Sequence, residues 1–352
     1  MKGGSTIGHN FKVTTWGESH GPAIGAIIEG CPSGLNLSQK DIQKEVNRRK
    51  PSKGSKVSTT RREKDEVKIL SGIFKGKTTG TPICMIVENK DVRNEDYSKI
   101  QQLYRPGHAD YTYDLKYGLR DYTGGGRASG RETLARVMAG AVAKLILAKQ
   151  TKTSIFGHTV KVGNIAAKKF DKSFIEKNEL RCADKKATKE MQSLIEKIRF
   201  NEGDSIGAVI EIIIKTPPKG LGDPVFDKLD ADLAKAMMSI GAVKGVEIGA
   251  GFSAAEMKGS ENNDEMRIDG KKVKFLSNNC GGILGGISTG EDIVIRLAIK
   301  PVPSISKPQK TVSTNKKNAL IKTLGRHDCC LAPRIIPVAE SMAAIVLADK
   351  FL

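Results

Sequence analysis

A serine and a histidine lie side by side in a glycine-bounded pentapeptide near the start of the chain. The stretch TTWGESHG spans Thr14–Gly21, and its Gly-x-Ser-x-Gly core places Ser19 where one class of hydrolases carries its nucleophile, with His20 beside it. A nucleophile elbow follows a strand and opens directly into a helix. Here Pro22 follows, and the next segment, AIGAII, favours a strand. The context argues against a hydrolase and leaves His20 as a structural turn residue or an acid–base group.

Two arginines flank the predicted start of a helix in GGGRASGRET, residues 124–133. Ser129 and Glu132 have the spacing of a capping box, which makes Glu132 a capping partner rather than a catalytic acid. The free N–H groups and the positive dipole end at such a start favour an anion. Arg127 and Arg131 would add bidentate donors for phosphate or carboxylate. The alternative is a flexible loop with solvated arginines. The sequence contains neither a P-loop nor a dinucleotide-binding fingerprint.

Two further short stretches combine arginine, histidine and aspartate. RPGHAD, residues 105–110, places His108 after a Pro-Gly pair, and GRHDCC, residues 325–330, joins an arginine and a histidine to Asp328. An arginine can hold a substrate anion while an imidazole or a carboxylate moves a proton. The alternative for each histidine is an ordinary turn residue. Three of the five histidines lie in these Gly/Arg-rich stretches. Together they predict acid–base chemistry on a phosphorylated or carboxylated small molecule.

Composition narrows the alternatives. The net charge of +19 is compatible with nucleic acid as a partner. However, aromatic residues make up only 5% of the chain, so stacking platforms are scarce, and a polyanionic small substrate explains a local basic site equally well. The six cysteines have neither zinc spacing nor an ordinary disulfide pattern, and we expect reduced thiols and no metal. Apolar stretches fall short of the roughly 20 residues of a membrane span, and the N-terminal residues lack a signal-peptide core. We expect a cytoplasmic protein that binds neither nucleic acid nor membrane.

The hydrophobic pattern predicts a single α+β domain over residues 1–352. Strands are expected at 11–16, 23–30, 67–74, 82–88, 208–214 and 292–300. Helices are expected at 41–50, behind the capping box through 145, and at 184–200, 229–240 and 339–351. Residues 104–126 show no clear period, which is typical of a long functional loop. Because strands and helices come in blocks rather than in strict alternation, a doubly wound parallel sheet is disfavoured.

Read in order, these stretches resemble the chorismate synthase family. The matching motifs include TTWGESHGPAIGAIIEGCPSG, RPGHADYTYDLKYGLRDYTGGGRASGRET, EGDSIGAVIE, NNCGGILGGISTG and GRHDCC, and they cover nearly the whole chain except about 150–200. The resemblance implies a β-α-β sandwich, with a helical layer between two antiparallel sheets, assembled as a homotetramer. It implies an anti-1,4-elimination of phosphate that converts 5-enolpyruvylshikimate 3-phosphate to chorismate, the last common step of aromatic biosynthesis. Reduced FMN is required without net redox change.

The resemblance also implies roles for individual residues. His20 would protonate or hydrogen-bond the departing phosphate, with Ser19 as its hydrogen-bonding neighbour. His108 would stabilise the reduced flavin, and Asp328 would act with the flavin N5 in removing the ring proton. The residues implied to hold the substrate anions are Arg49, Arg105 and Arg131. The implied flavin contacts are Arg127, Ala128, Ser129, Gly241, Ala242, Gly285, Lys300, Pro301, Val302, Pro303, Ser304 and Arg326.

Two further expectations concern the source of electrons and four departures from the family pattern. The chain has no obvious reductase insertion, so an external flavin reductase is expected and NADPH would enter only indirectly. A possible NADP contact or basic loop comprises Arg49 and Lys56. The residues that depart from the usual family pattern are Lys56, Ala128, Gly130 and Cys329. We expect these departures to bear on affinity more than on activity.

Overall fold

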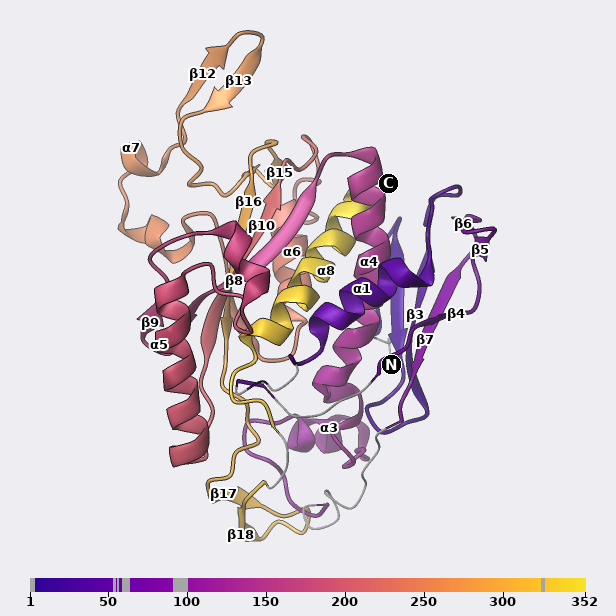
Figure 1. Cartoon of the computed structure of the whole chain (residues 1–352), viewed down its shortest axis with the longest axis vertical. Helices are drawn as coiled ribbons and strands as arrows, with labels where there is room; N and C mark the ends of the chain where they lie inside the picture. Colours follow the sequence, from indigo (N-terminus) through magenta and orange to yellow (C-terminus); the bar gives the residue numbers. More distant parts are fainter. Residues whose placement is uncertain (1–3, 53–54, 56, 59–63, 91–100, 324–326) are drawn as a thin grey trace.

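Two antiparallel sheets enclose a layer of helices (Figure 1). This computed structural model describes residues 4–52, 55, 57–58, 64–90, 101–323 and 327–352. The first sheet has the order β1-β2-β3-β7-β4, made of Thr6–Ile7, Lys12–Trp16, Ala23–Glu29, Ile83–Glu88 and Lys68–Ile69. The second has the order β11-β16-β10-β8-β9, made of Val243–Ile248, Ile293–Ile299, Ala208–Lys215, Ser154–Val162 and Ile165–Ala166. The arrangement is the predicted sandwich.

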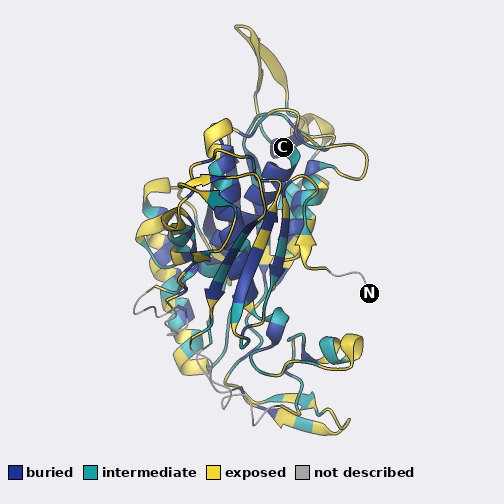
Figure 2. Ribbon diagram, turned by 90° about the vertical axis from the view of Figure 1, so that its right-hand side faces the viewer, coloured by how far each residue is buried: buried dark blue, intermediate teal, exposed yellow. Residues whose placement is uncertain are grey.

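The helical layer is built around the last helix of the chain. It contains α1 (Gln39–Arg49), α4 (Thr133–Gln150), α6 (Leu229–Met238) and α8 (Ala332–Phe351). α8 packs against α4, α1, α6 and the strands β8 and β10, and lies in the middle of Figure 1. Every residue from Ile335 to Asp349 is buried, so this mostly apolar helix is enclosed on all faces. Figure 2 shows the buried residues concentrated in this central region.

The remaining elements lie around this sandwich. The outer helices are α3 (Asp110–Tyr117), α5 (Lys185–Glu196) and the short α7 (Gly259–Asn262). Four hairpins pair β5 with β6 (Ile73–Phe74, Lys77–Thr78), β12 with β13 (Met266–Asp269, Lys272–Phe275), β14 with β15 (Ile283–Leu284, Ile287–Ser288) and β17 with β18 (Gln309–Val312, Asn318–Ile321). The β12–β13 hairpin projects from the body, with exposed side chains (Figures 1 and 2).

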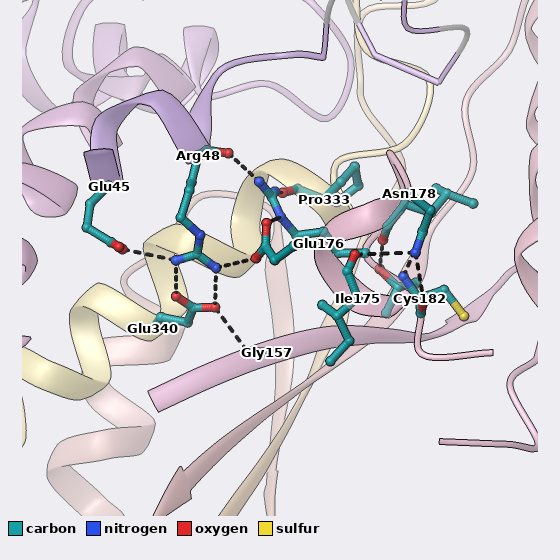
Figure 3. Close-up of polar contacts among 12 residues, drawn as sticks. Glu45, Arg48, Gly157, Ile175, Glu176, Asn178, Cys182, Pro333 and Glu340 are labelled. Carbon is teal, nitrogen blue, oxygen red and sulfur yellow. Dashed lines mark hydrogen bonds and ion pairs between the residues drawn. The ribbon is translucent and has the colours of Figure 1, made fainter. Parts of the chain in front are cut away.

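A buried ion pair joins α8 to α1 (Figure 3). Glu340 of α8 is fully buried and accepts hydrogen bonds from both terminal nitrogens of Arg48, at 2.6 and 2.9 Å. It also accepts one from Lys144 of α4 at 2.7 Å and one from the Gly157 N–H of β8 at 3.0 Å. Burial alone would raise the pKa of Glu340, but Lys144 and Arg48 bring that pKa down to about 2. One carboxylate thus ties three helices to the second sheet.

Two glycines permit close approach at places where a side chain would collide. Gly25 of β3 lies under the ring of Trp16, and a Cβ there would sit 2.2 Å from a ring carbon. Gly140 of α4 faces Ser341 of α8, where a Cβ would lie 2.2 Å from the serine Cβ. The contact between the two central helices therefore depends on the missing side chain at Gly140.

Replacing Gly140 with alanine tests that contact. We expect Gly140→Ala to lower the free energy of unfolding by roughly 1–3 kcal/mol, because overpacking between α4 and α8 outweighs the gain in helix propensity. Urea denaturation measures the effect. Gly259→Ala in α7 is the matched control, because no atom lies within 4 Å of its added Cβ. Equal stability of the two variants would show that α4 and α8 can separate without cost.

Three predicted elements differ from the observed ones. The strand expected at 67–74 is divided into β4 and β5, because Gly72 turns the chain with a φ of +82°. The segment 104–126, expected to be irregular, contains the helix α3. The last helix begins at Ala332 rather than at 339, with Pro333 in its first turn and Pro337 inside it. Prolines are tolerated in a first turn but disfavoured in a helix interior, which obscured the true start.

The predicted capping box before α4 is also wrong. Ser129 accepts a hydrogen bond from the Arg131 N–H, but its predicted partner Glu132 turns elsewhere. The Glu132 carboxylate accepts from Thr15 at 2.9 Å and from Arg136 at 2.9 Å. Two short 3₁₀ turns, Gly126–Ala128 and Gly130–Glu132, lead into α4 instead. Glu132 therefore links α4 to β2 rather than closing its own helix.

Candidate active site

A cavity of about 1220 Å³ opens where several helix ends converge. The C-terminal end of α1 and the N-terminal ends of α4 and α8 all contribute to its wall. Further parts of the wall come from the first residues of the chain, the loop after β2, the chain after α1, the segment before α3, and the chain after α6 and after β16. Small-molecule sites commonly occupy roughly 300–1,000 Å³, so this cavity has room for two ligands side by side.

The wall of the cavity is strongly cationic. Ten arginine and lysine side chains line it against three carboxylates, Asp65, Glu132 and Asp328. Burial lowers the pKa of Arg49 to about 10, and the charge of Arg334 acts in the same direction. Arg49 still carries its charge at neutral pH. The positive ends of the α4 and α8 dipoles add to this field. A ligand with several negative charges would supply the missing counter-charge.

His20 reaches the cavity from the loop between β2 and β3. Its Nδ1 lies 3.0 Å from the Ser19 hydroxyl oxygen. Gly124 has a φ of +68°, and a Cβ there would lie 2.2 Å from the imidazole, so only glycine leaves room for this ring. Ser19 is buried behind the histidine and does not line the cavity. The segment that follows is the strand β3, whereas a hydrolase nucleophile elbow opens into a helix. The structure therefore also argues against the hydrolase alternative.

Arg49 and Arg131 are held at the 3₁₀ turn Gly130–Glu132. Arg49 donates to the Thr133 hydroxyl at 2.8 Å and to the Gly130 carbonyl at 2.6 Å. Arg131 donates to Asn89 at 2.6 Å and pairs with Asp65 at 3.0 Å. The Asn89 amide also donates to the carbonyls of Glu18 and Gly21. Asn89 therefore connects Arg131 to the loop that carries His20.

The neighbouring residues Arg48 and Arg49 serve different parts of the molecule. Arg48 lies in the ion-pair cluster around Glu340, whereas Arg49 lines the cavity. Helical geometry turns successive side chains by about 100°, which directs the pair to different surroundings. The rigid pairing of Arg48 thus anchors the end of α1 from which Arg49 enters the site.

Arg105 and His108 enter from the segment before α3. Both line the cavity, and both contact the buried carboxylate of Asp110. Gly125 leaves room for the imidazole, because a Cβ there would lie 2.7 Å from the His108 Cε1. The glycine triplet of residues 124–126 therefore accommodates both histidines, in addition to leading into α4.

Asp328 and Arg334 form a pair at the start of α8. The Arg334 Nη1 donates to the Asp328 carboxylate at 2.5 Å. The Arg334 Nε is buried and has no hydrogen-bond partner within the described part of the chain. A buried donor of this kind is costly unless a ligand satisfies it. Sequence reasoning missed both Arg334 and Asp65. The only available signal for Arg334 was its place six residues after Asp328, in a helix whose start was misplaced.

The residues expected to hold flavin are largely brought together. Those that line the cavity are Arg127, Ala128, Ser129, Gly241, Ala242, Lys300, Val302, Pro303 and Ser304. An apolar part of the wall adds Ile7, Met238, Ile240 and Val243, which suits a flat ring system. Pro301 and Gly285 are not part of the wall, and Gly285 lies in the β14–β15 turn. Lys56 and Arg326 lie outside the described residues. The donors and the apolar surface thus fit a flavin with its phosphate.

Among the residues that the structure describes, no cluster of three or more histidine, cysteine, aspartate or glutamate side chains could hold a metal ion. Within the same residues, every helix is too short or too polar to cross a bilayer.

Comparison with known proteins agrees with this geometry. The family model described as chorismate synthase matches residues 11–352. The chorismate synthase of Methanosarcina mazei is 54% identical, over 99% of this chain and 96% of that protein. That of Syntrophobacter fumaroxidans is 52% identical, over 99% and 97%. A crystal structure of chorismate synthase superposes with a TM-score of 0.77 at 33% identity, covering 98% of this chain and 93% of that one.

The sandwich fold and the cationic cavity, which three imidazoles and three carboxylates also line, fit the class of enzymes that perform acid–base chemistry on a small polyanion. The chain belongs to the chorismate synthase family. Members of this family are carbon–oxygen lyases of the last common step of the shikimate pathway, and they use reduced flavin.

Proposed function

We propose that this protein converts 5-enolpyruvylshikimate 3-phosphate to chorismate in the cavity described above. The observation that carries the proposal is the meeting of three arginines, Arg49, Arg105 and Arg131, with His20 in one cationic cavity. The substrate has two carboxylates and one phosphate, which are the groups that arginine forks bind best. These three anionic groups together balance much of the excess positive charge of the wall.

The reaction requires the departing phosphate to be neutralised. The allylic C–O bond breaks with its electron pair on the phosphate, while the electrons of a ring C–H bond form the new double bond. We assign His20 to protonate or hydrogen-bond the leaving phosphate, with the Ser19 hydroxyl fixing its Nδ1 side. The arginines hold the substrate and stabilise the charge that develops on the phosphate. We assign Asp328 to the removal of the ring proton.

The cofactor proposal rests on the part of the same cavity that the expected flavin contacts line. Arg127, Ser129 and Lys300 would hold the flavin phosphate and ring, and Gly241, Ala242 and His108 would contact the ring. Reduced FMN, when bound, supplies an electron-rich ring next to the substrate. We expect the chain itself to contribute positioning, exclusion of water and the two proton transfers.

Assembly and supply of electrons are further parts of the proposal. We propose that residues 1–352 act as one domain within a cytoplasmic homotetramer, and that an external reductase provides reduced FMN. Gly285 supports a shared site, because it lies on an exposed turn with no atom within 4 Å of its Cβ position. Its proposed flavin contact would then come from another subunit. Lys56 remains a proposed basic-loop residue with Arg49.

An anaerobic assay tests the reaction. Purified protein is mixed with dithionite-reduced FMN and 5-enolpyruvylshikimate 3-phosphate, and chorismate absorbance and phosphate release are followed together. We expect both products in equal amounts, and neither with oxidised FMN. Flavin binding without product would mean that the departures at Ala128, Gly130 and Cys329 have changed the chemistry of the family fold.

The assignment of Asp328 predicts a slower proton removal. We expect Asp328→Asn to lower turnover by about 100-fold, because the amide keeps the shape of the site but cannot accept the proton. Deuterium at the transferred ring position should then slow the variant more than it slows the wild type. Asp269→Asn on the projecting β12–β13 hairpin is the matched control. An unchanged rate and isotope effect would remove Asp328 from the mechanism.

A further inference from the structure

Asp110 is a buried carboxylate just behind the cavity wall. Its side chain is 3% exposed and does not line the cavity. Its Oδ2 accepts from the Arg105 Nε at 2.7 Å and from the Arg105 backbone N–H at 3.0 Å. Its Oδ1 accepts from the Arg105 Nη2 and lies against the His108 Nδ1, each at 2.8 Å. One carboxylate therefore contacts two residues that do face the cavity.

The charge of Asp110 is secured from several directions. Burial would raise the pKa of Asp110, but hydrogen bonds with Arg105 and His108 hold it well below its ordinary value. Arg120, three residues after the end of α3, adds a second cation at 3.3 Å from Oδ2 and also pairs with Asp114. The segment after β16 contributes Lys300, which donates to the Gly107 carbonyl at 2.5 Å. Asp110 is an acceptor only, surrounded by donors.

This arrangement determines which nitrogen of His108 carries a proton in the neutral ring. An ionised carboxylate can only accept, so the Nδ1 beside Asp110 must be the donor. The Arg105 Nη2, which can only donate, lies 3.1 Å from the same Nδ1. A bare Nδ1 would however face the anionic Oδ1 at 2.8 Å, acceptor against acceptor, so the closer carboxylate decides. The other nitrogen, Nε2, is then left as an acceptor on the side of Gly125 and the cavity.

We propose that Asp110 is a positioning residue that fixes the tautomer of His108 and the orientation of Arg105 at the same time. The functional consequence for His108 rests on the proposed function, whereas the tautomer itself does not. In the neutral ring, Nε2 offers a lone pair to the cavity. When the ring takes up a proton at Nε2, Asp110 stabilises the resulting cation through Nδ1. The bidentate pairing likewise keeps Arg105 from rotating away from a bound anion.

Nuclear magnetic resonance of the ¹⁵N-labelled apoprotein tests the tautomer directly. The His108 signals are identified by their loss in His108→Gln, and two-bond ¹H–¹⁵N couplings are recorded at alkaline pH. We expect a protonated Nδ1 and a bare Nε2 in the wild type. Asp110→Asn should shift the population towards protonated Nε2. Asp114→Asn, which removes the carboxylate that pairs with Arg120 from α3, should leave the spectrum unchanged.

Kinetics provide the second measurement. We expect Asp110→Asn to lower kcat roughly 10- to 100-fold, as removal of a carboxylate partner of a functional histidine does elsewhere, and Asp114→Asn to leave kcat unchanged. A wild-type His108 with its proton on Nε2 would overturn the proposal even if Asp110→Asn fails to fold. An unchanged His108 spectrum in a folded Asp110→Asn protein would also overturn it. Because the spectra need neither flavin nor substrate, an inactive wild type would count against the proposed function alone.

Discussion

His20→Ala is expected to lower turnover by about 10²–10⁴-fold, the range that a positioned general acid contributes. His20 occupies a space that Gly124 leaves open, and the Ser19 hydroxyl fixes its Nδ1 side. His108 is not expected to replace it, because His108 is tied to Asp110. Removing the ring deprives the leaving phosphate of its proton donor while the arginines remain. Single-turnover phosphate release under anaerobic conditions measures the loss.

The matched control for this experiment is His9→Ala. His9 is exposed near the start of the chain, and its backbone N–H, rather than its ring, bonds to Asp349. We expect full activity in His9→Ala. Binding of reduced flavin should survive largely intact in His20→Ala, because the proposed flavin contacts lie elsewhere in the wall. Normal phosphate release by His20→Ala would refute the assigned role. Loss of flavin binding would instead indicate that His20 contacts the flavin rather than the leaving phosphate.

Glu340→Gln is expected to cost about 3–5 kcal/mol of the free energy of unfolding. The substitution keeps the size of the side chain but removes the anion that pairs with Arg48 (Figure 3) and with Lys144. Glu45 remains near both cations, at 3.0 Å from Arg48 and 2.6 Å from Lys144, so we expect the lower part of that range. Denaturant titration at neutral pH measures the difference. A change below 1 kcal/mol would show that the buried charges are not needed for stability.

The effect of Glu340 should depend on pH. Its folded pKa of about 2 lies below the ordinary value of 4.5, so its stabilisation is present above pH 4.5 and is lost as the pH falls towards 2. The gap between wild type and Glu340→Gln should therefore narrow across that window. Glu190→Gln on α5 is the control. Its partner Lys186 is highly exposed and 4.0 Å away, a pair expected to contribute less than about 1 kcal/mol.

Regular periodicity is what made most of the fold predictable. The strands β2, β3, β7, β10 and β16 lie where alternation or continuous apolar runs indicated them. α3 could not be predicted in this way, because its only buried residue is Asp110 and it has no apolar stripe. The start of α8 was hidden by Pro333 and Pro337. Elements that owe their position to polar contacts leave no hydrophobic period in the sequence.

The same distinction between local pattern and tertiary contact decides which site residues could be predicted from the sequence. The Gly/Arg-rich stretches indicated His20, His108 and Asp328, because such compositions favour loops that bind anions. Arg49 came only from the family resemblance, since a helical arginine on a basic helix is usually solvated. Arg334 and Asp110 could not be assigned, because their importance lies in what they touch across the cavity wall. Contacts of this kind depend on tertiary geometry rather than on local composition.

The central position of α8 has a consequence for synthesis of the protein. About 180 residues separate the end of α4 from the start of α8, so at 5–20 residues per second the ribosome needs roughly 10–40 s to supply the missing helix. During that time, α4 and the strands β8 and β10 lack the helix that packs against them. The nascent chain must therefore carry uncovered apolar surface for an interval that suits chaperone binding, and the enzyme gains both its core and its Asp328–Arg334 pair only at the end of translation.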